Sequence, residues 1–498
     1  MSVNSDSPDL PGPAGPAQEK PGATGTATAT TTAAEATTAT NAVPARRQGG
    51  FGALLARLHF YAGVLVAPFL LVAAVTGLLY AFTPQLDSFV YDKELHVSRT
   101  GDSVLPLSEQ VAAARAEHPE GTLTAVRPGS GEDTTQVDFA LPELGEKSHT
   151  VYVNPYTGDA TGQLTTWWTA TPLTTWLDVL HRDLHLGAVG NLYSELAASW
   201  LWVLVLGGLV LWWRRRSGSR TARHLLLPDR AAKKGVRRTR SWHAATGVWI
   251  AVGLLFLSAT GLTWSTYAGE NFSKALDSLR SSTPYVSTSL ADSATSDTGS
   301  GATKAADPSA VDGVLEAARE DGLTGPVAIS VPEDGATAWT VSQSRNLWPV
   351  GRDSVAVDPA TDKVVDRVDF ADWPVLSKLT TWGIQAHMGL LFGIVNQIVL
   401  AALAVGLIFV IVWGYRMWWQ RRPTRADRRT RLGVPPARSA WRGLPSWTVA
   451  VGIVVAAVGW VVPLFGIPLA VFLAVDLTVG AARRRTPASP TAGPASGG

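Results

Sequence analysis

Histidine is the residue type in this sequence that is best placed to do chemistry. Four of the nine histidines lie beside or within long apolar segments: His59, His181, His243 and His387. Ionisable groups are costly in a membrane and usually functional there, and the neutral imidazole is a common axial ligand of haem iron. The pattern favours two bis-histidine haem sites, one near each membrane face. One site pairs His59 with His243. The other pairs His181 with His387.

Two of these histidines belong to an internal repeat. The apolar segments 58–82 and 242–264 each place a glycine four residues after the histidine and a Thr-Gly pair seventeen residues after it. Two segments that share such a register are copies of one unit. The two glycines, Gly63 and Gly247, lie about one helical turn after their histidines. We expect them to leave a flat surface on which a porphyrin can lie.

The second site has two candidates for one of its ligands. His181 and His387 each lie thirty-one residues before a Trp-Trp pair, which favours His181. The local pattern His-x-Gly instead matches His185 with His387. We expect His181 to be the ligand, with His185 as a substitute or neighbour.

Other roles for histidine are less favoured by the pattern. A single histidine at the end of a span often only hydrogen-bonds lipid headgroups, but four at repeat-related positions favour ligation. His181 and His185 share a helix face, yet no glutamate completes an HExxH zinc motif. The chain has no cysteine, which excludes iron–sulfur clusters, thiolate metal sites and covalently attached haem c.

Composition and charge predict a polytopic α-helical membrane protein. The chain has 498 residues, 46 % of them hydrophobic, and a mean hydropathy of +0.12. The short loops after the second and fourth apolar segments are rich in Lys and Arg, so we expect these loops and both termini in the cytoplasm. The expected fold is a duplicated span–module–span unit, with two small extracytoplasmic α+β modules and a C-terminal helical hairpin.

The expected parts follow one another along the chain without overlap. They are a disordered tail (1–50), a first span (51–82), a first module (83–191), a second span (192–213), a basic loop (214–240), a third span (241–264), a second module (265–386) with a flexible insertion (281–309), a fourth span (387–419), a basic loop (420–445), a hairpin of two short spans (446–481) and a disordered tail (482–498). Pro463 lies where the hairpin must turn, which favours six spans over five.

The two modules share a pattern of elements. In the first, segment 107–118 predicts a helix, and segments 136–141 and 148–153 predict strands. In the second, segment 310–321 predicts the corresponding helix, and 327–331 and 338–343 predict strands.

One length is difficult to reconcile with a straight span. The 33 residues from His181 to Arg214 would form about 50 Å of continuous helix at 1.5 Å per residue. That exceeds the ~30 Å hydrocarbon core, so we expect the outer histidines to lie at or beyond the membrane edge, with a long electron-transfer distance, unless the helices tilt or break.

Several motifs together resemble a known family. The segments LHFYAGVLVAPFLLVAAVTGLLY, VLHRDLHLG, SWHAATGVWIAVGLLFLSATGLTW and HMGLLFG…GYRMWWQRRP resemble the PepSY-associated transmembrane family, also called iron-regulated or PiuB-like membrane proteins. The modules, which end in VYVNPYTGD and VAVDPATDK, resemble PepSY domains. The second departs from the first by having Asp362 where the first has Gly158.

The resemblance covers roughly residues 50–480 and implies a function. Some members of this family are haem b reductases that release iron from siderophores, so it implies a cytoplasmic-membrane protein with two haem b groups. By motif position the ligands are His59, His181, His243 and His387.

Electron transfer across the membrane to ferric iron or a ferric siderophore is therefore the expected activity. No nucleotide-binding fingerprint is visible, so we expect a separate electron donor, either a membrane quinol or a cytoplasmic reductase. The alternative is a non-enzymatic protein whose membrane-anchored modules bind or regulate an extracytoplasmic partner such as a peptidase. A transporter is less favoured, with Asn396, Gln397 and Asp476 as its few polar candidates. Nucleic acid is not expected, because membrane topology explains the basic loops.

Overall fold

The computed structural model describes residues 50–216, 226–229, 234–290, 307–334, 336–421 and 446–485. The tails expected at 1–50 and 482–498 lie wholly or partly outside the described residues. The same holds for the expected insertion 281–309 and the basic loops 214–240 and 420–445.

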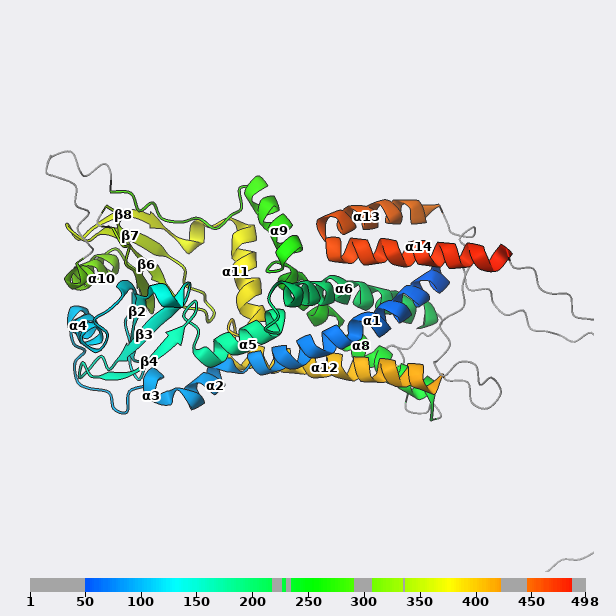
Figure 1. Cartoon of the computed structure of the whole chain (residues 1–498), viewed down its shortest axis with the longest axis horizontal. Coiled ribbons are helices and arrows are strands. Elements are labelled where there is room, and N and C mark those ends of the chain that lie inside the picture. The colour runs from blue at the N-terminus through cyan, green and yellow to red at the C-terminus, as the bar shows by residue number, and fades with distance from the viewer. Residues whose placement is uncertain are drawn as a thin grey trace, which may run out of the picture. The chain divides into compact units, whose positions relative to one another are not determined.

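Four long apolar helices form a bundle. They are α1 (Gly50–Tyr80), α6 (Ala188–Arg216), α8 (Val236–Leu262) and α12 (Ile394–Gln420). Each is at least 27 residues long, or about 40 Å, which is enough to cross the ~30 Å hydrocarbon core with some tilt. Figure 1 shows α1, α6 and α12 running lengthwise in the bundle. α1 and α8 each pack against both α6 and α12, so α1 and α8 lie diagonally opposite one another. The predicted polytopic helical membrane fold is confirmed.

The second and fourth long helices begin after a sharp elbow. His181 lies on a separate helix, α5 (Pro172–Asp183), and His387 ends the corresponding helix α11 (Val375–His387). The first elbow runs through Leu184 and His185, both with a φ of 57° in the left-handed region. A Cβ on Gly190 would lie 1.6 Å from the carbonyl oxygen of Asp183, so only glycine fits where the two helices meet.

The elbow resolves the excess length of this segment. Because the chain turns after Asp183, α5 packs against α1 and α6 and does not prolong α6. The segment is therefore broken into two helices, and the straight helix of about 50 Å does not form. The boundary expected for the fourth span at residue 387 is shifted, since α12 begins at Ile394, seven residues later.

Outside the bundle, the two module halves share one antiparallel sheet. Its order is β4-β3-β2-β1-β5-β6-β7-β8. The strands are β1 (Thr122–Arg127), β2 (Thr135–Ala140), β3 (Ser148–Val153), β4 (Ala160–Thr166), β5 (Val327–Ser330), β6 (Trp339–Gln343), β7 (Ser354–Asp358) and β8 (Lys363–Val368). β1 pairs with β5, with Val126 opposite Ile329, so this contact joins the halves into one structural unit.

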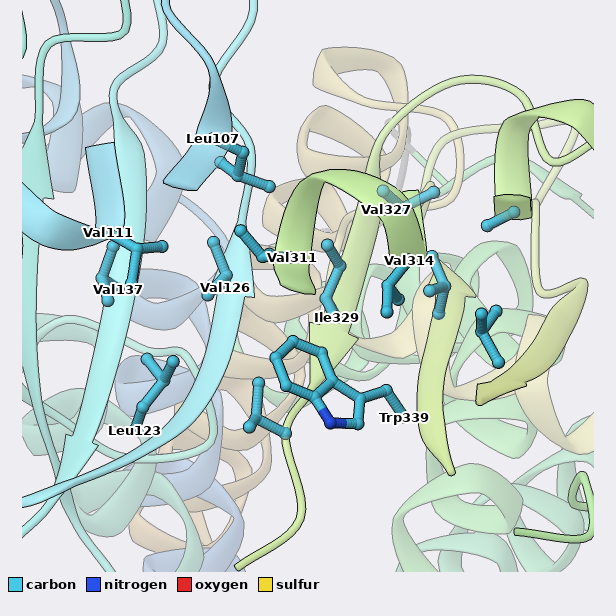
Figure 2. Close-up of a cluster of buried hydrophobic side chains, with 14 of the residues drawn as sticks. Leu107, Val111, Leu123, Val126, Val137, Val311, Val314, Val327, Ile329 and Trp339 are labelled. Atoms are coloured by element: carbon cyan, nitrogen blue, oxygen red, sulfur yellow. The ribbon is translucent and has the colours of Figure 1, made fainter. Parts of the chain in front are cut away.

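Two helices complete the core of the sheet. α4 (Leu107–Glu117) and α10 (Val311–Glu320), one from each half, pack against each other and against strands of their own halves. Figure 2 shows Val126, Val311, Ile329 and Trp339 in the resulting apolar cluster, where each side chain is fully buried. The sequence predicted both helices and the strands β2, β3, β5 and β6 to within about one residue at each end. It did not predict β1, β4, β7 and β8 as strands, and it predicted two separate modules.

A carboxylate from one half caps the helix of the other, and we expect its loss to loosen the sheet. Asp312 Oδ1 accepts from the backbone N–H of Leu107 at 2.6 Å, and Oδ2 accepts from that of Ser108 at 3.1 Å. Losing a helix cap costs about 1 kcal/mol. Asp312→Ala should therefore lower the apparent Tm of the purified protein by about 2–4 °C. Glu316→Ala, an exposed acid on the same helix, should leave Tm unchanged; equal shifts for both variants would contradict the capping role.

The remaining helices connect these units. They are α2 (Thr83–Val90), α3 (Asp92–Leu95), α9 (Thr266–Ser278) and the 3₁₀ turns η1 (Pro142–Leu144), η2 (Pro308–Ala310) and η3 (Phe370–Asp372). Glu195 in α6 is buried and accepts from the backbone N–H of Tyr267 at 3.0 Å and of Ala268 at 2.9 Å. This glutamate therefore holds the first turn of α9 against the bundle.

The C-terminal hairpin is confirmed as a pair of helices. They are α13 (Trp447–Val461) and α14 (Pro463–Arg485), which turn at Val462. Arg57 of α1 forms a buried ion pair with Asp476 of α14, and Trp200 donates to the carbonyl of Leu464 at 3.1 Å. α13 has 15 residues and is about 22 Å long, shorter than the hydrocarbon core. Six crossings therefore stay a prediction.

Candidate functional site

The first pair of predicted histidines meets inside the bundle. His59 comes from α1 and His243 from α8, and their ring centroids are 6.4 Å apart with the planes at 83°. Two imidazoles that share a metal atom at about 2.1 Å per bond have centroids roughly 6 Å apart. The distance between these two rings thus suits a metal atom placed between them. We refer to them as the arginine-end pair, because arginines line the same end of their cavity.

The arginine-end pair lines a cavity of about 530 Å³ within the four helices. This volume lies in the range of pockets that hold small organic ligands and cofactors. Apolar side chains from all four helices form most of its wall, including Val64, Leu201, Val248 and Leu407. The mostly apolar wall would shield much of a bound ligand from water.

Glycines shape this cavity around the two rings. A Cβ on Gly247 would meet no atom within 4 Å, and one on Gly63 would meet only Leu204 Cδ2 at 4.0 Å. These two glycines therefore leave open space on the cavity wall, and the flat surface for a porphyrin stays a prediction. On the facing helices, a Cβ on Gly208 would lie 3.2 Å from His59 Cε1 and one on Gly414 would lie 3.8 Å from His243 Cε1. The latter two glycines make room for the imidazole rings.

The orientation of His243 is fixed by the backbone. Its Nδ1 lies 2.9 Å from the carbonyl oxygen of Val410, which can only accept, so Nδ1 carries the proton. His243 Nε2 therefore keeps a free lone pair. The corresponding nitrogen of His59, Nδ1, is buried without a hydrogen-bond partner in the described part of the chain.

The second pair, His181 and His387, is positioned by threonines of the repeat. We call it the sheet-end pair, since α5 also contacts β4. His181 Nδ1 lies 2.9 Å from the hydroxyl of Thr76, and His387 Nδ1 lies 2.6 Å from that of Thr260. His181 also lies close enough to His387 to interact with it electrostatically.

The threonine hydroxyls determine the tautomer of these histidines. Thr76 Oγ1 lies 2.9 Å from the carbonyl of Val72, and Thr260 Oγ1 lies 2.9 Å from that of Phe256. Both contacts are satisfied when each hydroxyl donates its one proton to that carbonyl and its oxygen accepts from the histidine Nδ1–H. Nε2 of both histidines is left deprotonated. A histidine that binds a metal through one ring nitrogen commonly donates a hydrogen bond from the other ring nitrogen, as these two histidines do.

The glycine of each Thr-Gly pair gives the histidine ring its space. A Cβ on Gly77 would lie 3.0 Å from His181 Cε1, and one on Gly261 would lie 3.6 Å from His387 Cε1. The repeated register identified the Thr-Gly pairs but not their role, because their histidine partners lie on helices distant in the sequence.

His185 lies apart from both pairs. It is exposed on the elbow after α5, and its ring is 5.1 Å from that of Trp176. The offset between His181 and His387 also equals that between Gly208 and Gly414, as expected for repeat-related positions. Within the described ranges, no three His, Cys, Asp or Glu side chains gather as a metal site of the zinc type.

Polar contacts hold the short helices α2 and α5 together. Asp87 of α2 accepts from the hydroxyls of Thr171 at 2.7 Å and Thr174 at 2.6 Å, at the start of α5. Burial raises the pKa of the Asp87 carboxyl, while these two hydrogen bonds act in the opposite direction. Thr171 also caps α5 by accepting from the backbone N–H of Thr174. α5 is therefore anchored at the end opposite His181.

The polar residues considered for transport have structural partners. Asn396 donates to the carbonyl of Ala386 at 2.9 Å and holds the end of α11 next to His387. Gln397 accepts from Gln85 at 2.9 Å, which ties α12 to α2. These contacts position the second elbow.

Both histidine pairs and all eight strands lie within residues 56–421, which match the model of a family described as PepSY-associated TM region. The chain belongs to the PepSY-associated TM region family. The resemblance of the motifs to this family is thereby confirmed. The C-terminal helical pair lies beyond the matched residues of this PepSY-associated protein. A comparison with curated proteins found no match.

Proposed function

We propose that this PepSY-associated membrane protein binds two haem b groups and carries electrons across the membrane to ferric iron. The observation that supports it best is the tautomer arrangement. Three histidines, one of the arginine-end pair and both of the sheet-end pair, have Nδ1 engaged by a carbonyl or hydroxyl oxygen. In the described ranges Nε2 of these three makes no hydrogen bond, so each ring offers a lone pair suited to iron.

The residues of each pair have distinct roles in this proposal. His59 and His243 would hold the haem iron at the arginine end, and Gly63 and Gly247 would give the group room beside them. Thr76 and the equivalent threonine hold the sheet-end histidines in the ligating tautomer. Bound haem supplies reversible one-electron exchange between ferric and ferrous iron.

The direction of transfer follows from charge. Arginines cluster at the end of the bundle that holds the first pair, so the positive-inside rule puts this end in the cytoplasm and the sheet outside. Electrons then enter from a quinol or a cytoplasmic reductase and leave near the sheet. Chelators with hard oxygen ligands prefer ferric iron, so reduction of a ferric siderophore outside releases the metal.

Ferric reduction is tested with the purified protein. The protein, reconstituted with haem and reduced with dithionite, is freed of excess reductant and mixed with a ferric hydroxamate chelate. We expect the reduced haem bands to disappear while ferrozine captures Fe(II). The double variant His181→Ala/His387→Ala should lose most of this reaction. Reduced bands that persist in the unaltered protein would contradict the reductase function.

Thr76→Val is expected to weaken haem binding at the sheet-end pair by about tenfold. Valine has the shape of threonine but cannot accept from His181 Nδ1–H, and loss of such a partner commonly costs ten- to a hundredfold in metal affinity. Haemin titration of the apoprotein measures the effect. Thr76→Ser keeps the hydroxyl and should restore affinity. Thr478→Val, on the exposed face of α14, is the matched control; unchanged binding in Thr76→Val would contradict the role of Thr76.

A further inference from the structure

One end of the bundle cavity is lined by a cluster of positive charge. The cluster consists of Arg215 from α6, Arg237 and Arg240 from α8, and Arg421, which follows α12. Asp229 is the acidic residue that lines the same cavity among the described residues. Four guanidinium groups and one carboxylate therefore meet beside a mostly apolar cavity.

The four arginines oppose one another electrostatically. All four guanidinium groups carry a positive charge and line the same cavity. In the described ranges none of the four forms an ion pair. Like charges near an apolar surface repel more strongly than in water, because the effective dielectric constant is lower. An anion between them would remove this repulsion.

Membrane topology alone does not explain the cluster. The positive-inside rule accounts for arginines near the ends of the helices, but not for which way they face. On α8, Arg237 and Arg240 line the cavity, whereas the neighbouring Arg238 does not. Arg240 precedes His243 by three residues, a spacing that puts both on one helix face.

We propose that the arginine cluster binds the two carboxylate side chains of the porphyrin that His59 and His243 hold. This inference rests on the proposed function and specifies how the ligand is oriented in the cavity. In this orientation the ring would lie between the two histidines, its carboxylates would face the arginines, and its apolar edge would point along the bundle in the direction of Leu70 and Leu254.

The chemistry of the residues suits this orientation. Guanidinium groups form paired, charge-assisted hydrogen bonds with carboxylates, which are stronger and more directional than neutral ones. The arginines come from three helices, so they can approach both carboxylates from different sides. The cavity changes from charged at this end to apolar at the level of Leu70, as a porphyrin does from one edge to the other.

The test compares two porphyrins that differ only in these carboxylates. The full-length apoprotein, carrying His181→Ala/His387→Ala to leave one site, is titrated with haemin and with haemin dimethyl ester. We expect haemin to bind at least tenfold more tightly than the ester. The unaltered protein, with all histidines intact, is titrated with the same two porphyrins for comparison.

Variants of the cluster identify the residues responsible. In Arg215→Gln/Arg240→Gln the preference for haemin over the ester should fall to within about threefold, and Arg238→Gln should keep the full preference. The midpoint potential of the bound haem should also fall in the double variant, because nearby positive charge favours the reduced form.

The outcomes separate this inference from the proposed function. Equal binding of haemin and ester by the parent protein would overturn the inference and leave haem binding intact, since the arginines would then serve a different anion. A preference that persists in Arg215→Gln/Arg240→Gln would overturn it as well. Absence of any bis-histidine spectrum with either porphyrin would contradict the proposed function itself.

Discussion

A chain that carries both His59→Ala and His243→Ala is expected to bind one haem where the unaltered protein binds two. These are the two histidines that line the cavity, and their rings are spaced for a shared metal atom. With both imidazoles removed, the cavity retains its shape but has no nitrogen ligand for the iron. Pyridine haemochrome assay of the purified protein gives the haem content per chain.

A matched control for this double variant exists in the sheet. His118 and His149 also stack closely, with ring centroids 4.2 Å apart, but they lie on the first half of the sheet. His118→Ala/His149→Ala should keep two haems per chain. The single variant His59→Ala should keep the haem with one axial ligand and give a high-spin spectrum. Two low-spin haems in the His59→Ala/His243→Ala protein would contradict the assignment.

Gly247→Leu is expected to have a comparably large effect by filling the same cavity. A Cβ at this position meets no atom within 4 Å, so the leucine side chain would extend into the space beside His243 without a clash. The protein should therefore fold normally, and leucine is also the better helix former by about 0.5–1 kcal/mol. We expect haem at the arginine-end pair to fall by tenfold or more.

The control for Gly247→Leu is a glycine that lies outside the bundle cavity and has the same open space around an added Cβ. Gly452 of α13 also has no atom within 4 Å of an added Cβ. Gly452→Leu should leave haem content and spectrum unchanged, and both variants should show a similar apparent Tm. If Gly247→Leu bound two haems per chain with an unaltered low-spin spectrum, no porphyrin ring would lie beside Gly247.

The repeat made the membrane part of this protein predictable. Apolar length and the shared register of histidine and glycine depend only on local sequence, and they gave the long helices and the His59–His243 pairing that the bundle brings together. The positions of the two elbows could not be predicted from the sequence. Leu184 and His185 adopt a positive φ that their residue types do not signal, and hydropathy does not detect such a break.

Contacts between distant segments account for most of what the sequence did not reveal. The pairing of β1 with β5 depends on two strands from opposite halves, although Val126 and Ile329 look like ordinary core positions in each half. The hydrogen bonds of His181 with Thr76 and of His387 with Thr260 likewise join helices far apart in the chain. Sequence patterns show which residues recur, whereas their partners depend on the packing of the whole fold.

The haem content of the unaltered protein tests the central claim most directly. The protein is expressed with ample haem, purified in detergent, and its optical spectrum is recorded in the oxidised and dithionite-reduced states together with a pyridine haemochrome assay. We expect sharp reduced bands of low-spin, bis-histidine haem b and two haems per chain. A colourless protein that also fails to bind added haemin would contradict the account and would favour a membrane-anchored PepSY module without a redox function.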